Sequence, residues 1–239
     1  MLRNYLLMVM CCLWASAASA EMTTLKTAYG TSFDAYVAGP VDAKIGIVIG
    51  HDRWGLADEV KVWADRYAKQ GFQVVVADLF DGRPVPRDST AKMVMAQTDP
   101  EWVIANLNGA IDYLKREQDL VAAIGWGYGA KHLYQIASSN DANIDALVAF
   151  YAMPRDNQKG LERLDMPILG LFGRRDPAFG IEQLDEFQQT MLKLRKSLDV
   201  VTVNAHSGFV NPMSSSYNAV ASEEAWQAIQ RFLKRHFTE

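Results

Sequence analysis

The chain contains a glycine-rich turn of a kind that usually holds a nucleophile. In residues 119–130, Asp-Leu-Val-Ala-Ala-Ile-Gly-Trp-Gly-Tyr-Gly-Ala, a β-rich run ends at Ile124 and a helical pattern follows the glycines. A strand–turn–helix of the form G-x-Nuc-x-G exposes a serine or cysteine for attack on an acyl carbon. The central position here is Gly127. The turn therefore has the expected form but no side chain able to form a covalent intermediate.

An acid and a histidine follow this turn in the order nucleophile, acid, histidine. Asp176 comes after the apolar run 167–172, and His206 comes after the run 199–203. A carboxylate that orients a histidine makes that histidine a general base. We therefore predict Asp176 and His206 as catalytic residues. Ser207, next to His206, has no such turn around it and is expected to be a turn residue.

A further polar group, His51-Asp52-Arg53-Trp54, follows the apolar run 45–49. We expect these residues to line a pocket beside Gly127, with Trp126 as a second aromatic wall. The histidines and carboxylates of the three segments lie on different loops without helical ligand spacing. No metal site and no cofactor are therefore predicted.

Strand and helix patterns alternate along most of the chain. Residues 22–38 predict two short antiparallel strands around Gly30-Thr31. Buried strands are expected at 45–49, 72–80, 120–124, 144–151, 167–172 and 199–203. Helices are expected at 57–70, 100–115, 128–138, 181–196 and from 222 onward, with a short helix near 91–96. This alternation predicts a mostly parallel sheet with helices on both faces. All the candidate site residues then follow carboxyl ends of strands, where sites lie in such sheets.

The first 20 residues have the features of a secretory signal. Arg3 precedes the apolar run 5–14, and Ala18-Ser19-Ala20 is typical of a cleavage site. The run is too short to span a bilayer. We therefore expect an exported domain of residues 21–239, periplasmic or extracellular, without a membrane span. Both cysteines, Cys11 and Cys12, lie in the signal, so that domain has neither disulfide nor thiolate.

The remaining composition is that of one globular domain without a nucleic-acid partner. The chain has 239 residues and a net charge of −4, and no stripe of basic residues is evident. A protein partner is left open by the sequence.

Taken together, five segments resemble the dienelactone hydrolase family. They are residues 49–56, 68–80, 125–129, 173–176 and 205–209, and the resemblance extends from about residue 30 to 237. It implies an α/β-hydrolase fold and cleavage of lactones and related esters through a Cys-His-Asp triad. The family's cysteine falls on Gly127, its acid on Asp176 and its histidine on His206.

The same resemblance implies further roles. The backbone N–H groups of Arg53 and Tyr128 would form the oxyanion hole. The family also has a glutamate that helps control the thiol, and its position falls on Asp52, which is one methylene shorter. Of two arginines that bind the substrate carboxylate, one is matched by Arg83, whereas the other is lost and Asn211 is the nearest polar residue. An anionic dienelactone is therefore a questionable substrate.

Two functions follow from these residues. One is hydrolysis of a small ester or lactone by a water molecule that His206 activates in the space left free at Gly127. The other is a catalytically inactive hydrolase that binds a small ester, lactone or related acid, or a protein partner. The retained Asp176 and His206 favour hydrolysis, whereas Gly127 favours the inactive protein.

Overall fold

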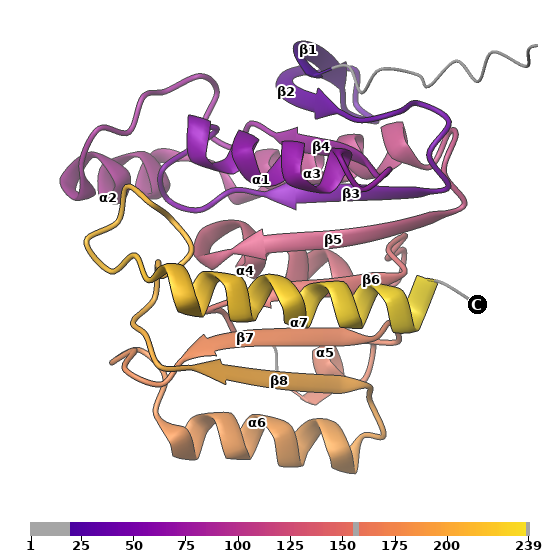
Figure 1. Ribbon diagram of the computed structural model, residues 1–239. Helices are drawn as coiled ribbons and strands as arrows, with labels where there is room; N and C mark the ends of the chain where they lie inside the picture. Colours follow the sequence, from indigo (N-terminus) through magenta and orange to yellow (C-terminus); the bar gives the residue numbers. More distant parts are fainter. Residues whose placement is uncertain (1–19, 155–157, 238–239) are drawn as a thin grey trace, which may run out of the picture.

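The computed structural model describes residues 20–154 and 158–237, which form an eight-stranded sheet between two layers of helices (Figure 1). The strand order is β1-β2-β4-β3-β5-β6-β7-β8, in which β1 and β2 are antiparallel to their neighbours and the other pairs are parallel. The strands are β1 (Ala20–Lys26), β2 (Ser32–Ala38), β3 (Ile45–Gly50), β4 (Gln73–Ala77), β5 (Leu120–Trp126), β6 (Ala146–Phe150), β7 (Ile168–Gly173) and β8 (Leu198–Val203). The helices are α1 (Asp58–Ala68), α2 (Asp88–Gln97), α3 (Pro100–Leu114), α4 (Gly127–Ala137), α5 (Gln158–Leu161), α6 (Ile181–Lys193) and α7 (Ala219–Phe237).

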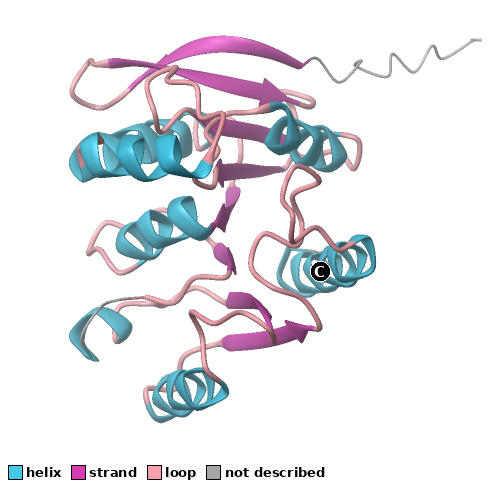
Figure 2. Ribbon diagram, turned by 90° about the vertical axis from the view of Figure 1, so that its left-hand side faces the viewer, coloured by secondary structure: helices cyan, strands magenta, loops and turns pink. Residues whose placement is uncertain are grey.

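The central strands form where the sequence has continuous apolar runs. Every residue of β4, β6 and β7 is buried, as expected for parallel strands covered on both faces. Side chains alternate between two cores, so Val48 belongs to one, and Ile47 and Ile49 belong to the other. Helices α3, α4 and α6 cover the first core, and α1 and α7 cover the second (Figure 2).

The mostly parallel sheet with helices on both faces, predicted from the alternating pattern, is confirmed, and so is the α/β-hydrolase fold that the resemblance implied. Most boundaries differ by one to three residues, but β4 ends at Ala77, three residues before the predicted end. It ends there because the Asp78 carboxylate accepts the Phe80 and Gly82 amides and turns the chain out of the sheet. Helix α5 was not predicted, because four residues give no helical period. Residues 1–19 of the predicted signal lie outside the described residues.

The carboxyl end of β3 and the start of α4 are in direct backbone contact. The Gly129 amide donates to the His51 carbonyl at 3.0 Å, and a Cβ added at Gly129 would overlap the Gly50 carbonyl. Only a residue without a side chain permits this approach. The contact places the loop after β3 beside the turn at Gly127.

We predict that Gly129→Ala destabilises the protein by about 1–3 kcal/mol or more, because the new methyl group forces β3 and α4 apart. Urea unfolding measures this change. Gly180→Ala is the matched control: nothing lies within 4 Å of its added Cβ, so its cost stays below about 1 kcal/mol. Equal losses in the two variants would contradict the role of this contact.

His132 on α4 gives the stability a dependence on pH. Burial lowers the pKa of His132 below its ordinary 6.5, and its hydrogen bond with Gln135 opposes this shift only in part. The unfolded chain therefore takes up a proton before the folded chain does as the pH falls. The resulting loss of stability begins near pH 6.5 and levels off below the folded pKa.

We predict that His132→Gln loses less stability between pH 7.5 and 5.5 than the wild type. Urea unfolding at both pH values measures the difference. Asn108→Gln, at an exposed residue that does not titrate, is the control and keeps the wild-type slope. An unchanged slope in His132→Gln would contradict the assignment.

Candidate active site

The turn at Gly127 has the backbone form of a nucleophile elbow. β5 ends at Trp126, α4 begins at Gly127, and Gly127 has φ +43°. This left-handed conformation is strained for residues with a side chain and is free of that strain for glycine. The Tyr128 amide lies in the first turn of α4, where backbone N–H groups have no partner within the helix. It therefore remains available as an oxyanion donor.

The carboxylate of Asp52 stands where the elbow side chain would be. A Cβ built on Gly127 would lie 2.6 Å from Asp52 Oδ1 and 3.4 Å from its Cγ. These separations leave no room for a serine or cysteine beside Asp52 in this conformation. The space that we expected a water molecule to fill is thus occupied by a carboxylate.

The same carboxylate engages the second expected oxyanion donor. The Arg53 amide donates to Asp52 Oδ1 at 2.8 Å. The Arg53 guanidinium stacks over Trp54 at 5.0 Å and lies 3.4 Å from an oxygen of Asp88 on α2. A substrate oxyanion must therefore use Tyr128 alone or compete with Asp52 for the Arg53 amide.

Asp176 and His206 lie on neighbouring loops without touching through their side chains. The Arg175 amide donates to the Ala205 carbonyl at 3.0 Å, which holds the two loops together. Asp176 is buried, its Oδ1 accepts the Ala178 amide, and its Oδ2 has no hydrogen-bond partner. His206 is exposed and has no hydrogen bond among the described residues. An imidazole turned inward would supply the donor that Asp176 Oδ2 lacks.

A cavity of about 270 Å³ opens beside Gly127. We call it the elbow cavity. This volume is close to the lower limit for small-molecule sites, so it suits a small substrate. The cavity is lined by Asp52, Arg53, Met95, Gly127, Tyr128, Lys131, Tyr151, Asp176, Ala178, Phe179, Ser207 and Gly208.

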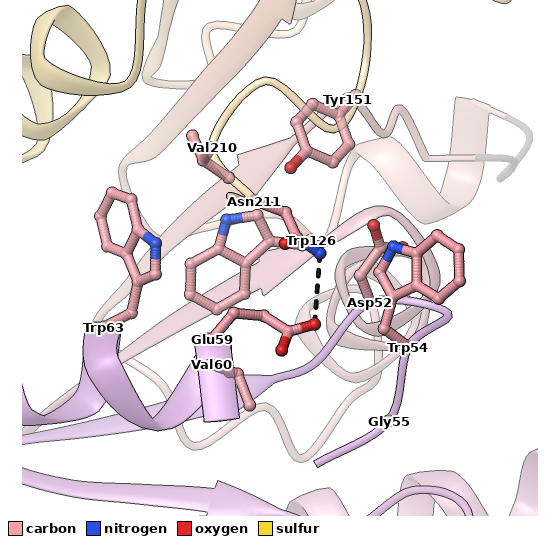
Figure 3. A pocket seen from close by; sticks show the side chains of 10 residues that line it. All are labelled: Asp52, Trp54, Gly55, Glu59, Val60, Trp63, Trp126, Tyr151, Val210 and Asn211. Atoms are coloured by element: carbon pink, nitrogen blue, oxygen red, sulfur yellow. Dashed lines mark hydrogen bonds between the residues drawn. The ribbon is translucent and has the colours of Figure 1, made fainter. Parts of the chain in front are cut away.

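A second cavity, behind Asp52, is walled by aromatic rings (Figure 3). Its volume of about 30 Å³ admits one or two water molecules and no substrate. Trp126 Nε1 is buried without a partner, which suits such water. We call this space the aromatic cavity. It is lined by Asp52, Trp54, Gly55, Glu59, Val60, Trp63, Trp126, Tyr151, Val210 and Asn211.

Several predicted pocket residues lie away from the elbow cavity. The His51 ring is fully buried, with Nε2 accepting the Leu79 amide and Nδ1 2.7 Å from the Asp52 carbonyl, so it anchors the loop after β3. Arg83 bonds the Phe80 carbonyl and Thr98, and thereby ties the loop after β4 to the end of α2. Asn211 donates to Glu59, and Trp54 and Trp126 face the aromatic cavity (Figure 3).

Several residues that line the elbow cavity, Tyr151, Met95 and Lys131 among them, were not predicted from the sequence. Tyr151 follows β6 with φ +40°, and it lines both cavities. Burial first, and then the Asp52 and Asp176 charges, raise the pKa of Tyr151 well above 10, so its hydroxyl stays neutral. The signal for Tyr151 was its place at a strand's carboxyl end. Met95 on α2 and Lys131 on α4 had no comparable signal.

Comparison with known proteins identifies the family. The dienelactone hydrolase family model matches residues 33–237. This chain belongs to the dienelactone hydrolase family. Since the match spans both the fold and the elbow, the chain is a member of a hydrolase family whatever its elbow residue.

Individual relatives are distant but cover nearly the whole chain. A Saccharolobus solfataricus protein named "Putative carboxymethylenebutenolidase" is 22% identical and covers 86% of this chain and 95% of its own. Protein usf of Aquifex pyrophilus is 24% identical, and the match covers 87% of this chain and 96% of that protein. The structure of a dienelactone hydrolase-like promiscuous phosphotriesterase from metagenomic libraries superposes with a TM-score of 0.81 at 21% identity. The superposition covers 92% of this chain and 98% of that one. This structural likeness supports the fold.

The described residues were also searched for a metal site and for a membrane-spanning helix. Within residues 20–154 and 158–237, no group of three or more His, Cys, Asp or Glu side chains is arranged to hold a metal ion. In the same part of the chain, no helix has the length and apolar character needed to cross a bilayer.

We predict that Gly127→Ala costs about 1–3 kcal/mol, because the methyl group meets Asp52 Oδ1 and φ +43° becomes strained. In an Asp52→Ala background the cost falls, because only the strain remains. A double-mutant cycle of urea unfolding energies measures the coupling. Strict additivity would show that the Asp52 carboxylate does not occupy the elbow position.

Proposed function

We propose that this protein hydrolyses a small ester or lactone in the elbow cavity without forming an acyl-enzyme. The observation that carries the proposal is a cavity of small-substrate size that holds both Gly127 and the buried Asp176. The family supports the hydrolase class, and the missing nucleophile requires that water attack the carbonyl carbon directly.

The groups around the cavity suit this reaction. The Tyr128 amide at the start of α4 can stabilise the charge that develops on the carbonyl oxygen. His206 turns inward when substrate binds, pairs with Asp176 Oδ2, and gives a proton to the leaving alkoxide. Hydrogen bonds of this kind often form only in the substrate complex, which accounts for the exposed His206 of the free protein.

A catalytically inactive, ligand-binding protein is the second candidate. The observation that favours it is the bond from the Arg53 amide to Asp52, which takes up one oxyanion donor. This function predicts a saturable change in tryptophan fluorescence on adding a lactone or its acid, with no product formed.

We also propose export through a cleaved signal, which rests on residues 1–20 alone. The mass of the mature protein recovered from cell fractions tests it. A product beginning at Glu21 outside the cytoplasm is expected, whereas an uncleaved cytoplasmic chain would refute it.

We predict that the protein hydrolyses ethyl acetate or γ-butyrolactone, and that His206→Ala lowers kcat/KM by about 10²–10⁴-fold, because alkoxides leave poorly without a proton. Titration of the released acid at constant pH measures the rate. His236→Ala, in the last turn of α7, is the control and keeps the wild-type rate. Absence of any rate above solvent would favour the binding protein.

A further inference from the structure

We infer that Asp52 takes over the task of the missing elbow residue: its carboxylate is the general base that activates the attacking water. This inference rests on the proposed hydrolysis and names the residue that begins it. The resemblance gave Asp52 only the place of a glutamate that controls a thiol, and this chain has no thiol at the elbow.

Asp52 lies where the reacting atom of an elbow nucleophile would lie. Its Oδ1 lies 2.6 Å from the Cβ position of residue 127, in the space that a nucleophile's oxygen or sulfur would fill. Substrates that dock against the Tyr128 amide therefore present their carbonyl carbon next to this carboxylate. Gly127 permits the arrangement, because any side chain there would displace Asp52.

Asp52 has one carboxylate oxygen that is held in place and one that can accept a proton. Oδ1 is held by the Arg53 amide at 2.8 Å, whereas Oδ2 has no partner among the described residues. Asp52 lines the elbow cavity, so a water molecule there can donate to Oδ2. By contrast, the His206 side chain is exposed and is absent from the lining residues of this cavity.

In the proposed reaction, Asp52 accepts the proton of the attacking water and His206 protonates the leaving oxygen. Water donates one proton to Asp52 while its oxygen bonds to the carbonyl carbon, and the carbonyl π electrons move to the oxygen facing Tyr128. The tetrahedral intermediate collapses, the bond to the leaving oxygen breaks, and protonated His206 gives that oxygen a proton. Asp52 returns its proton through solvent to His206. The products are one acid and one alcohol.

A role as nucleophile fits the geometry less well. If Oδ1 attacked the substrate carbonyl carbon, the carbonyl oxygen would need the Arg53 amide as an oxyanion donor. That amide already donates its hydrogen bond to Oδ1. A base keeps this bond throughout the reaction, and the amide then holds the carboxylate in position.

The test uses p-nitrophenyl acetate, whose leaving group departs without a proton. We expect Asp52→Asn to lower kcat/KM by at least about 100-fold, and His206→Ala by much less. Asp42→Asn, the same change in an exposed turn, keeps the wild-type rate. Asp52→Asn within threefold of wild type would overturn the inference while leaving the proposed hydrolysis intact. No rate in the wild type would overturn both.

Chemical rescue separates catalysis from a structural role. Asp52→Ala leaves a carboxylate-sized space, so added sodium formate should raise its rate in a saturable way and leave the wild type unaffected. A rate of Asp52→Ala that formate does not change would contradict the base role. Circular dichroism melting confirms that each variant folds.

Isotope labelling detects a covalent anhydride that water opens at the Asp52 carbonyl carbon. After many turnovers in H₂¹⁸O, the peptide that contains Asp52 should keep its ordinary mass, because a base never bonds to the acyl group. A gain of ¹⁸O in that peptide would show a covalent anhydride and overturn the assignment.

Discussion

The site depends on the backbone contact between the end of β3 and the start of α4. Gly129 donates its amide to the His51 carbonyl, and no side chain separates Gly129 from Gly50. His51 fixes the same loop from the other side, through the Leu79 amide and the Asp52 carbonyl. With both sides held, the Asp52 side chain is directed at Gly127. A loosened contact would move the carboxylate away from the elbow without altering any residue of the site.

Two residues that line the elbow cavity lower the stability of the folded protein. Asp176 Oδ2 is buried without a hydrogen bond, which costs about 1–3 kcal/mol or more for a charged group. Tyr151 has φ +40°, a conformation that costs about 1–3 kcal/mol outside glycine. Such costs cluster where binding or catalysis requires them. Asp176 and Tyr151 both line the elbow cavity, whereas only Tyr151 lines the aromatic cavity. This agrees with an elbow cavity that receives a small molecule.

The sequence predicted the fold well because its signals are local. Apolar runs such as 45–49 and the helical period of 57–70 depend only on neighbouring residues, and the order of elements leaves few topologies. The elbow was predicted for the same reason, since glycines at 125, 127 and 129 are close in the chain. The Asp52 contact was not predicted, because 75 residues separate Asp52 from Gly127 and a side-chain rotamer decides it. Arg83 and Asn211 had suitable chemistry, but their partners, Thr98 and Glu59, direct them elsewhere.

The overlap between Asp52 and a side chain at position 127 also bears on how such an elbow can change over evolutionary time. A single substitution that introduces serine or cysteine at position 127 meets the Asp52 carboxylate, which must then move aside. Loss of Asp52 alone leaves an elbow with neither nucleophile nor carboxylate. The two positions are therefore coupled, and a covalent mechanism at this elbow would require residues 52 and 127 to change together.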